Sequence, residues 1–160
     1  MNQGQRAVVV VVSDRSASGA REDRSGPVAV DLLRGAGLIA AEPVVVPDGV
    51  ESVAEALRDA VADGVALVVT SGGTGVGPRD ETPEGTRPIL AKELPGIGEL
   101  LRRSSDVPTA ALSRGLAGVT REGTVVVNLP GSPGGVREGL DVLLPLLPHL
   151  LSQVAGGDHA

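Results

Sequence analysis

The chain of 160 residues contains no cysteine and no Phe, Tyr or Trp. Without cysteine it can form no disulfide, no thiolate metal site and no thiol nucleophile, which is compatible with a reducing cytoplasm. Without aromatic rings it cannot stack nucleotide bases, so single-stranded nucleic-acid modules that depend on stacking are excluded. Any planar heterocycle bound here must instead be held by backbone amides, polar side chains, Arg guanidinium groups and aliphatic side chains.

Long apolar runs and an excess of positive charge are also lacking. The formal net charge is −6, with acidic and basic residues interspersed, so binding to nucleic acid or to an anionic membrane is not expected. The apolar run at residues 7–12 is too short for a secretory signal, and no segment approaches membrane-spanning length. We therefore expect a cytoplasmic protein, and the length fits a single domain over residues 1–160.

Strand and helix patterns alternate along the chain. Apolar, β-branched runs predict strands at residues 7–12, 38–46, 65–70 and 124–128, with Pro43 marking an edge or a bulge. Helical periodicity and helix-boundary residues predict helices at 25–33, 51–62, 83–93, 97–103 and 136–151. Ser25 is the expected N-cap of the first helix, and Pro145 and Pro148 are expected to disturb the second half of the last. Residues 13–24 are expected to form a loop, and residues 109–120 are ambiguous.

Strands separated by helices predict an α/β fold, a three-layer α/β/α domain with a mostly parallel central sheet and right-handed crossovers. Ligands bind such sheets beyond the carboxyl ends of the strands, near a topological switch point. The polar loops of this chain all follow predicted strands, at 13–14, at Asp48, at 71–80 and at 128–132. We expect these loops to meet at one edge of the sheet.

The segment that follows the strand at 65–70 is rich in glycine. Ser71-Gly72-Gly73-Thr74-Gly75 is followed by Gly77, Asp80 and the start of a helix at Thr82-Pro83-Glu84. Glycines at this point allow positive φ angles and a close approach of backbone N–H groups to an anion. The segment is neither a Walker A loop nor a GxGxxG fingerprint. It predicts a phosphate-binding loop; the alternative is a strand-to-helix turn that needs glycine for geometry alone.

Two acidic residues lie in separate loops that follow strands, Asp48 and Asp80. Two carboxylates at a phosphate site usually hold a divalent cation such as Mg²⁺ together with phosphate oxygens. The alternatives are a turn-forming role for Asp48 in Pro-Asp-Gly and a helix-capping role for Asp80. Sequence spacing alone leaves both possibilities open.

Other polar segments have weaker signals. Ser13-Asp14-Arg15 could hydrogen-bond a ligand ring or only cap a loop, and Arg79 could contact phosphate oxygens or only face solvent. Residues 128–133 carry polar groups for an anion or a heterocycle, or form an ordinary strand-to-helix turn. Ser113-Arg114-Gly115 offers a hydroxyl and a cation, but nothing in the pattern ranks it above a surface loop.

Taken together and in this order, the motifs resemble a known family. They are Val-Ser-Asp at 12–14, Glu-Asp-Arg-Ser-Gly-Pro at 22–27, Val-Pro-Asp at 46–48, Thr-Ser-Gly-Gly-Thr-Gly at 70–75, Pro-Arg-Asp-Glu-Thr-Pro-Glu at 78–84, Leu-Ser-Arg at 112–114 and Asn-Leu-Pro-Gly-Ser-Pro at 128–133. This set resembles the MogA/MoaB family of molybdenum cofactor biosynthesis proteins and is similar to the G domains of plant and animal molybdenum-cofactor enzymes, including gephyrin. The resemblance covers about residues 7–152 and leaves 153–160 as a short, flexible tail.

The resemblance implies a mixed sheet, assembly as a homotrimer, and the Mg²⁺- and ATP-dependent adenylylation of molybdopterin with release of pyrophosphate. By position, Asp48 and Asp80 match the two acidic residues tied to catalysis and to Mg²⁺. The remaining matches fall in substrate- and nucleotide-binding motifs: Ser13, Asp14, Ser71, Gly72, Gly73, Thr74, Gly75, Arg79, Ser113, Asn128, Pro130, Gly131 and Ser132. A hand-over of product to a molybdate-inserting protein is also implied.

Two other functions stay open. A catalytically silent molybdopterin-binding or carrier protein of the MoaB type would share these motifs, although the presence of both Asp48 and Asp80 favours an enzyme. A Rossmann-like nucleotide binder of unrelated purpose would need a GxGxxG fingerprint and an acidic residue about twenty positions later, and the sequence has neither.

Overall fold

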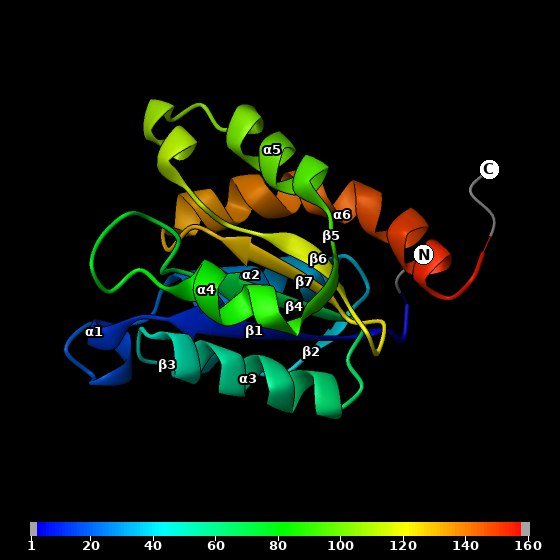
Figure 1. Cartoon of the computed structure of the whole chain (residues 1–160), viewed down its shortest axis with the longest axis horizontal. Coiled ribbons are helices and arrows are strands. Elements are labelled where there is room, and N and C mark those ends of the chain that lie inside the picture. Colours follow the sequence, from blue (N-terminus) through cyan, green and yellow to red (C-terminus); the bar gives the residue numbers. More distant parts are fainter. Residues whose placement is uncertain (1–2, 158–160) are drawn as a thin grey trace.

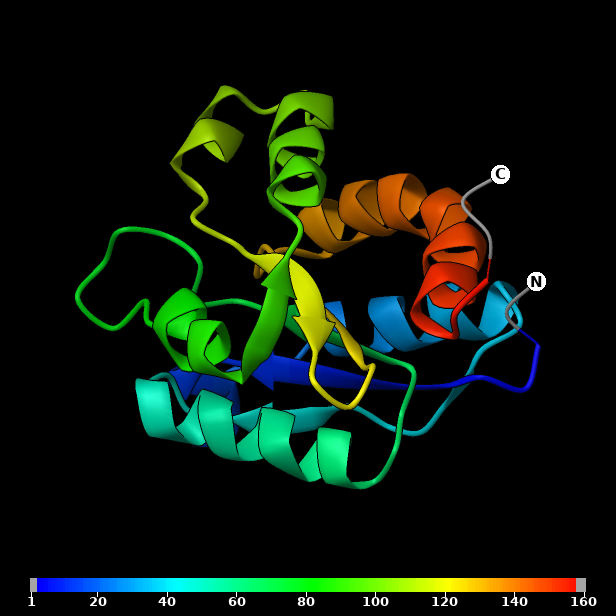
Figure 2. The ribbon, with the colours of Figure 1, turned by 45° about the vertical axis from the view of Figure 1, so that its right-hand side comes forward.

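A seven-stranded sheet lies between two layers of helices in the computed structural model, which describes residues 3–157. Helices α2 (Ser25–Gly35) and α6 (Pro133–Val154) cover one face of the sheet, and α3 (Val50–Ala62) and the short α4 (Thr82–Thr86) cover the other (Figures 1 and 2). Helix α5 (Pro95–Ser104) packs on α6. The chain therefore has the predicted three-layer α/β/α architecture.

The sheet is mostly parallel, with two antiparallel strands at one edge. Its strands are β1 (Arg6–Val12), β2 (Ile39–Ala40), β3 (Val44–Val46), β4 (Leu67–Ser71), β5 (Leu90–Glu93), β6 (Ala117–Thr120) and β7 (Val125–Leu129). The order is β2-β1-β4-β7-β6-β5, and β3 also pairs with β1. Strands β1 to β4 and β7 pair in parallel, whereas β6 runs antiparallel to both β7 and β5. This mixed sheet agrees with the expectation.

The strand order reverses around β1, because the chain passes from β1 to β2 and β3 on one side and then to β4 on the other. Val12 pairs with Val46, Val11 with Ser71, and Ser71 with Leu129. The carboxyl ends of β1, β3, β4 and β7 therefore reach the same edge of the sheet. Binding sites of open α/β sheets lie at such a reversal.

Alternation along the buried strands divides the core into two layers. Val9 and Val11 pack with α2 and α6, whereas Val10 and Val12 pack with α3. Because a parallel strand in the middle of the sheet is covered on both faces, every second residue serves a different layer and all must be apolar. The continuous valine run of β1 follows from this requirement.

Several predicted elements differ in the structure. The helix expected at 83–93 is wrong: α4 ends at Thr86, a 3₁₀ turn covers Arg87–Ile89, and Leu90–Glu93 forms β5. Pro88 cannot donate the backbone hydrogen bond that a continuing helix needs, and pairing with β6 takes up the following residues. The strand expected at 38–46 is divided into β2 and β3, with Pro43 between them.

Helix boundaries also differ. The N-cap of α2 is Arg24 rather than Ser25, whose hydroxyl instead donates to Asp23 Oδ1 at 3.4 Å. The loop expected at 13–24 contains a short helix α1 (Asp14–Ala17), capped by Ser13, whose Oγ accepts from Ser16 N at 3.2 Å. The ambiguous segment 109–120 contains the end of a 3₁₀ helix (Pro108–Leu112) and the strand β6.

Helix α6 continues through Pro145 and Pro148 to Val154. Leu140, Leu143 and Leu147 of this helix are completely buried, so tertiary packing outweighs the hydrogen bonds that the two prolines remove. The predicted tail therefore begins inside α6, and its last residues, 158–160, lie outside the described residues. The prediction of a single domain with a flexible tail stays a prediction. Within residues 3–157, no helix combines the length and the apolarity needed to cross a bilayer.

Candidate functional site

A cavity of about 600 Å³ opens at the carboxyl edge of the sheet, beside the reversal of strand order. Its lining comes from the loops after β1, β3, β4 and β7 and from the segment between α1 and α2. The lining residues that sequence reasoning singled out are Ser13, Asp48, Ser71, Gly72, Gly73, Asp80, Gly131 and Ser132. The structure thus brings the predicted loops together in one site.

The glycine loop is held by its own backbone geometry. Gly72 and Gly73 have φ angles of 107° and 68°, and a Cβ atom at Gly72 would overlap the carbonyl oxygen of Val12. The hydroxyl of the buried Thr82 donates to Gly72 O at 2.9 Å, which fixes the loop against the start of α4. Among the described residues, none accepts a hydrogen bond from the N–H of Gly73, Thr74 or Gly75. These donors can therefore bind an anion.

Asp14 and Asp48 hold each other across the ends of β1 and β3. The N–H of Asp14 donates to Asp48 Oδ2 at 2.9 Å, and the N–H of Asp48 donates to Asp14 Oδ1 at 3.1 Å. Arg79 completes the arrangement by donating to both oxygens of Asp14 and to the carbonyl of Asp48. Arg79 does not line the cavity, because its guanidinium binds the Asp14 carboxylate and the Asp48 carbonyl.

The electrostatics of Asp48 favour a bound cation. Burial raises the pKa of the Asp48 carboxyl above its usual range, and the charges of Asp14 and Asp80 raise it further. The backbone N–H of Asp14 and the guanidinium of Arg79 oppose this effect without cancelling it. In contrast, the hydrogen bond from Arg79 lowers the pKa of Asp14. The Asp48 carboxylate on the cavity wall is therefore partly desolvated and lies within the field of two other acidic side chains.

The donor set fits a magnesium ion that is shared with a substrate. No group of three His, Cys, Asp or Glu side chains in the described part of the chain could hold a metal by itself. Mg²⁺ in phosphoryl-transfer sites, however, is held by one or two carboxylates and completed by phosphate oxygens and water. Asp48 and Asp80 both line the cavity, and a divalent cation between them would offset the mutual repulsion of their carboxylates.

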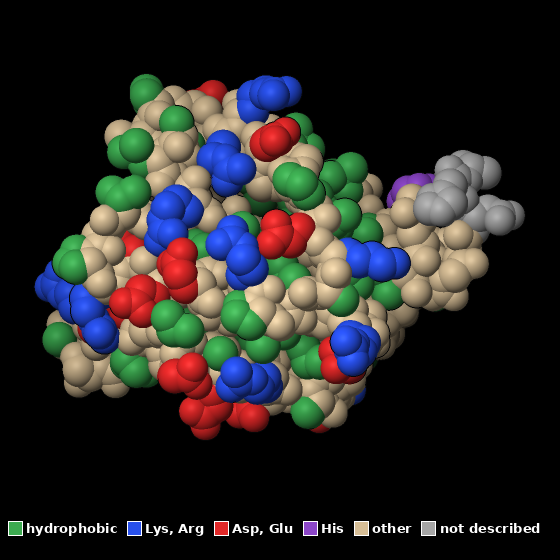
Figure 3. Space-filling model, in the orientation of Figure 1, with side chains coloured by type: hydrophobic (Ala, Val, Ile, Leu, Met, Phe, Trp, Pro, Cys, Tyr) green, Lys and Arg blue, Asp and Glu red, His purple; other side chains and the backbone are tan. Residues whose placement is uncertain are grey.

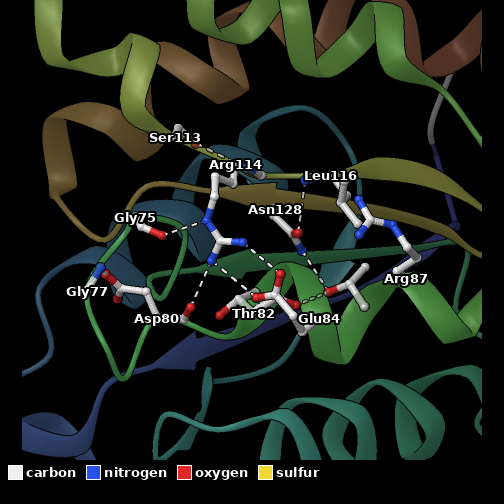
Figure 4. A network of polar contacts seen from close by, with 12 residues as sticks. Gly75, Gly77, Asp80, Thr82, Glu84, Arg87, Ser113, Arg114, Leu116 and Asn128 are labelled. Atoms are coloured by element: carbon white, nitrogen blue, oxygen red, sulfur yellow. Dashed lines mark hydrogen bonds and ion pairs between the residues drawn. The ribbon is translucent and has the colours of Figure 1, made fainter.

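Arg114 holds the loop that carries Asp80 (Figure 4). Its guanidinium donates to Gly75 O and Asp80 O, both at 2.8 Å, and forms a two-pronged ion pair with Glu84 at 2.7 and 3.2 Å. The backbone N–H of Arg114 donates to Thr74 O at 2.8 Å. The sequence indicated Arg114 only as a possible cation in a surface loop, because its partners lie thirty or more residues away. Glu84, directly after Pro83 at the start of α4, was the only local indication of an acidic partner for an arginine.

Asn128 and Ser71 are buried and connect neighbouring strands; of the two, Ser71 also lines the large cavity. Asn128 Nδ2 donates to Thr70 Oγ1 at 2.9 Å and to Thr86 Oγ1 at 3.1 Å, while its Oδ1 accepts from Leu116 N at 3.0 Å. Ser71 donates to Pro130 O at 2.8 Å. Asn128 therefore joins β4, β7, α4 and the approach to β6.

A second cavity of about 310 Å³ adjoins the first and shares Ser132 with it. Four of the predicted site residues line this second cavity instead: Thr74, Gly75, Ser113 and Pro130. Its other walls come from residues 105–112 and from the first two turns of α6. The predicted residues thus fall into two compartments, and Asp14, Arg79 and Asn128 lie outside both.

The cavity also contains residues that were not predicted. Arg21 and Arg24 line its wall, next to Glu22 and Asp23, and neither arginine forms an ion pair within residues 3–157. The motif at 22–27 was part of the family resemblance, but its charged residues were not assigned a role. Both signs of charge are interspersed on the face shown in Figure 3, so overall charge gives no further indication of the site.

Comparison with known proteins shows extensive similarity. A family model described as a probable molybdopterin binding domain matches residues 8–149. A molybdenum cofactor biosynthesis bifunctional protein of Synechococcus elongatus is 43% identical over 158 residues, which cover 98% of this chain and 49% of that protein. The chain thus spans about half the length of this relative.

Two further relatives match over most of their own length. A molybdopterin adenylyltransferase of Helicobacter pylori is 39% identical over 153 residues, covering 92% of this chain and 86% of that protein. The solved structure of a protein named MogA superposes with a TM-score of 0.90 at 48% identity, covering 94% of this chain and 99% of that one. Both the fold and the sequence therefore agree with these proteins along nearly the whole chain.

Proposed function

The chain belongs to the MogA/MoaB family of molybdenum cofactor biosynthesis proteins, and from that premise we propose that it adenylylates molybdopterin with ATP. An oxygen of the molybdopterin phosphate attacks the α-phosphorus of ATP, a new P–O bond forms, and the bond to the β-phosphate breaks. The products are adenylyl-molybdopterin and pyrophosphate. The attacking oxygen is already ionised, so the reaction requires no general base from the protein.

One observation carries the proposal: Asp48 and Asp80 line the same cavity as Gly72 and Gly73. The free N–H groups of residues 73–75 supply donors for phosphate oxygens, and the carboxylates supply ligands for a cation. In phosphoryl and nucleotidyl transfer the protein contributes positioning and charge neutralisation rather than covalent chemistry. The site contains the groups that both tasks need.

Asp48 and Asp80 are the residues that would hold Mg²⁺. When bound, the ion would neutralise phosphate charge and help align the two reacting groups. The protein's own contribution is to keep the Asp48 carboxylate in place through Asp14 and the Asp80 loop in place through Arg114. The predicted contact between Arg79 and phosphate has less support, because Arg79 is bonded to Asp14. Arg21 and Arg24 are better placed for a phosphate chain, since both line the cavity.

The remaining expectations concern the cellular context. We propose a homotrimer in the cytoplasm that passes its product to a molybdate-inserting protein, as the family resemblance implies. Sedimentation equilibrium of the purified protein would test the trimer. A change in molecular mass in the presence of a candidate acceptor would test the hand-over.

The decisive experiment incubates purified protein with molybdopterin, ATP and Mg²⁺ and measures both pyrophosphate and adenylyl-molybdopterin. Asp80→Asn should abolish turnover while it keeps most of the molybdopterin affinity. Asp59→Asn, on the exposed side of α3, removes the same charge far from the cavity and should leave the rate unchanged. Tight binding of molybdopterin without turnover by the unmodified protein would instead assign the chain to the carrier class.

A further inference from the structure

Glu138, in the second turn of α6, has an unusual carboxylate. Among residues 3–157, its Oε2 is the one buried side-chain nitrogen or oxygen atom without a hydrogen-bond partner. A buried carboxylate oxygen without a donor costs free energy, and such atoms in native proteins usually indicate a missing ligand, ion or water. This oxygen belongs to a residue that lines the second cavity.

Arg102 does not compensate the charge of Glu138. Arg102 lines a small recess together with Glu138, yet it donates to the carbonyls of Ser113 and Gly115, at 3.4 and 3.2 Å, and forms no ion pair with Glu138. Arg102 thus shapes the cavity wall by holding the segment 113–115. The side chain of Glu138 lines the second cavity, and its carboxylate has no ion-pair partner within residues 3–157.

The rest of the second cavity suits a planar heterocycle. Ala110, Leu112 and Pro130 provide aliphatic walls, and Ser132 connects the cavity to the phosphate site. Because the chain has no aromatic side chain, a bound ring cannot be recognised by stacking on one. Selectivity for the ring must therefore come from hydrogen bonds along its edge.

We propose that Glu138 is a specificity-determining residue that binds the pyrimidine edge of the pterin ring through its carboxylate. A pterin presents two adjacent donors there, the 2-amino group and N3–H, and a carboxylate can accept from both at once. Adenine offers a single amino group next to the acceptor N1, which a carboxylate would repel. The inference rests on the proposed function, since it places the ring of molybdopterin in the second cavity and its phosphate towards the first.

The test compares two ring systems that differ at one position. Pterin carries a 2-amino group, whereas lumazine carries a 2-oxo group, and both are fluorescent. Binding of each to the whole protein is measured by fluorescence titration and repeated by calorimetry. Glu138→Gln replaces one acceptor by a donor and should weaken pterin binding about 10- to 100-fold, as expected for a lost hydrogen bond to a charged group. Lumazine affinity should hold or improve, since the amide matches its oxo group and N3–H.

A matched control removes the same charge elsewhere. Glu55→Gln, exposed on α3 across the sheet, should keep the pterin preference of the unmodified protein. Melting temperatures establish that both variants are folded, and Glu138→Asp, which retains the carboxylate, should keep the order of preference at reduced affinity. The KM for molybdopterin should rise in Glu138→Gln, with little change in the KM for ATP.

The outcomes separate this inference from the proposed function. An unchanged ratio of pterin to lumazine affinity in Glu138→Gln would overturn the inference even if the enzyme is active. A raised KM for ATP with unchanged pterin binding would place the adenine here and would overturn it too. If the ratio shifts but the unmodified protein produces no adenylyl-molybdopterin, the pterin site stands and the adenylyltransferase does not.

Discussion

Asp14 and Asp48 exchange backbone-to-carboxylate hydrogen bonds of 2.9 and 3.1 Å across the ends of two parallel strands. The pairing of Val12 with Val46 places the two residues opposite each other, and a bond of 2.9 Å from Ser13 N to Val46 O extends that pairing by one step. These hydrogen bonds therefore restrain the position of the Asp48 carboxylate. Asp14 acts as its positioning residue.

Removing this support should reduce turnover more than binding. Asp14→Ala keeps the backbone N–H that donates to Asp48 Oδ2, but it removes the carboxylate that accepts from Asp48 N and from Arg79. The backbone of Asp48 then loses its anchor, and we expect kcat to fall about 10- to 100-fold, the scale of a misplaced catalytic group. The KM for ATP should change less. Steady-state kinetics would measure both. In Arg79→Gln the reciprocal bonds remain, so the loss should be only a few-fold, because the Arg79 side chain is 62% exposed and its ion pair is weak. Equal losses in both variants would instead indicate that Arg79 itself contacts substrate.

The raised pKa of Asp48 predicts a conflict between stability and activity. A carboxyl whose folded pKa lies above its unfolded value of 3.8 favours folding at low pH, and that contribution is lost as pH rises through the folded pKa. The ionised carboxylate therefore opposes folding at neutral pH. Asp48→Asn should raise the melting temperature by about 1–3 °C at pH 7, although it abolishes turnover. Thermal melts should show the difference shrinking as pH falls towards 3.8; a difference that is constant with pH would rule out this cause.

The sequence predicted the elements that local pattern determines. The valine runs of β1 and β7 and the apolar face of α3 could be identified because burial on both sides, or on one stripe, gives each a distinct periodicity. The region 83–93 was wrongly predicted as a single helix, because the pairing of its last residues with β6 involves residues up to thirty positions later. Thr82-Pro83-Glu84 indicates the start of a helix, but this start pattern does not indicate how many turns the helix has.

The same distinction applies to the site. The loops that follow strands were predicted to meet, because parallel strands end at a common edge, and they do. The roles of Arg114 and Glu138 could not be predicted. The role of an arginine depends on which groups accept its hydrogen bonds, and the acceptors of Arg114 lie in a loop that is distant in the sequence. Nothing in the sequence distinguishes Glu138 from an ordinary exposed glutamate of an amphipathic helix.

The network around Arg114 predicts a specific loss of order in the loop 75–80. Arg114→Lys keeps the charge but cannot donate to Gly75, Asp80 and Glu84 together. We expect the KM for ATP to rise about tenfold, since each lost hydrogen bond to a charged group contributes about 1.5–3 kcal/mol. Limited proteolysis should cut the loop faster. The exposed Arg121, changed to lysine, provides the control and should alter neither quantity.

The Arg114–Glu84 pair also has a pH dependence of known sign. The hydrogen bond from Arg114 lowers the pKa of Glu84 below its usual 4.5. Its stabilisation is therefore present above that value and is lost as pH falls through the lower folded pKa. The difference in melting temperature between the unmodified protein and Arg114→Lys should narrow on acidification. A difference that widens in acid would contradict the assignment.

Gly72 is the position where the loop tolerates no side chain. Its φ of 107° is unfavourable for any other residue. A Cβ atom would also overlap Val12 O, and Val12 cannot move away because β1 is paired with strands on both sides. Gly72→Ala should therefore lower the free energy of unfolding by about 2–4 kcal/mol, measured by urea denaturation. Gly96→Ala, at an open position in α5, should instead be neutral or stabilise by about 0.5–1 kcal/mol. If the two variants prove equally stable, the loop backbone can adjust, and the close approach of Gly72 to β1 does not determine the shape of the cavity.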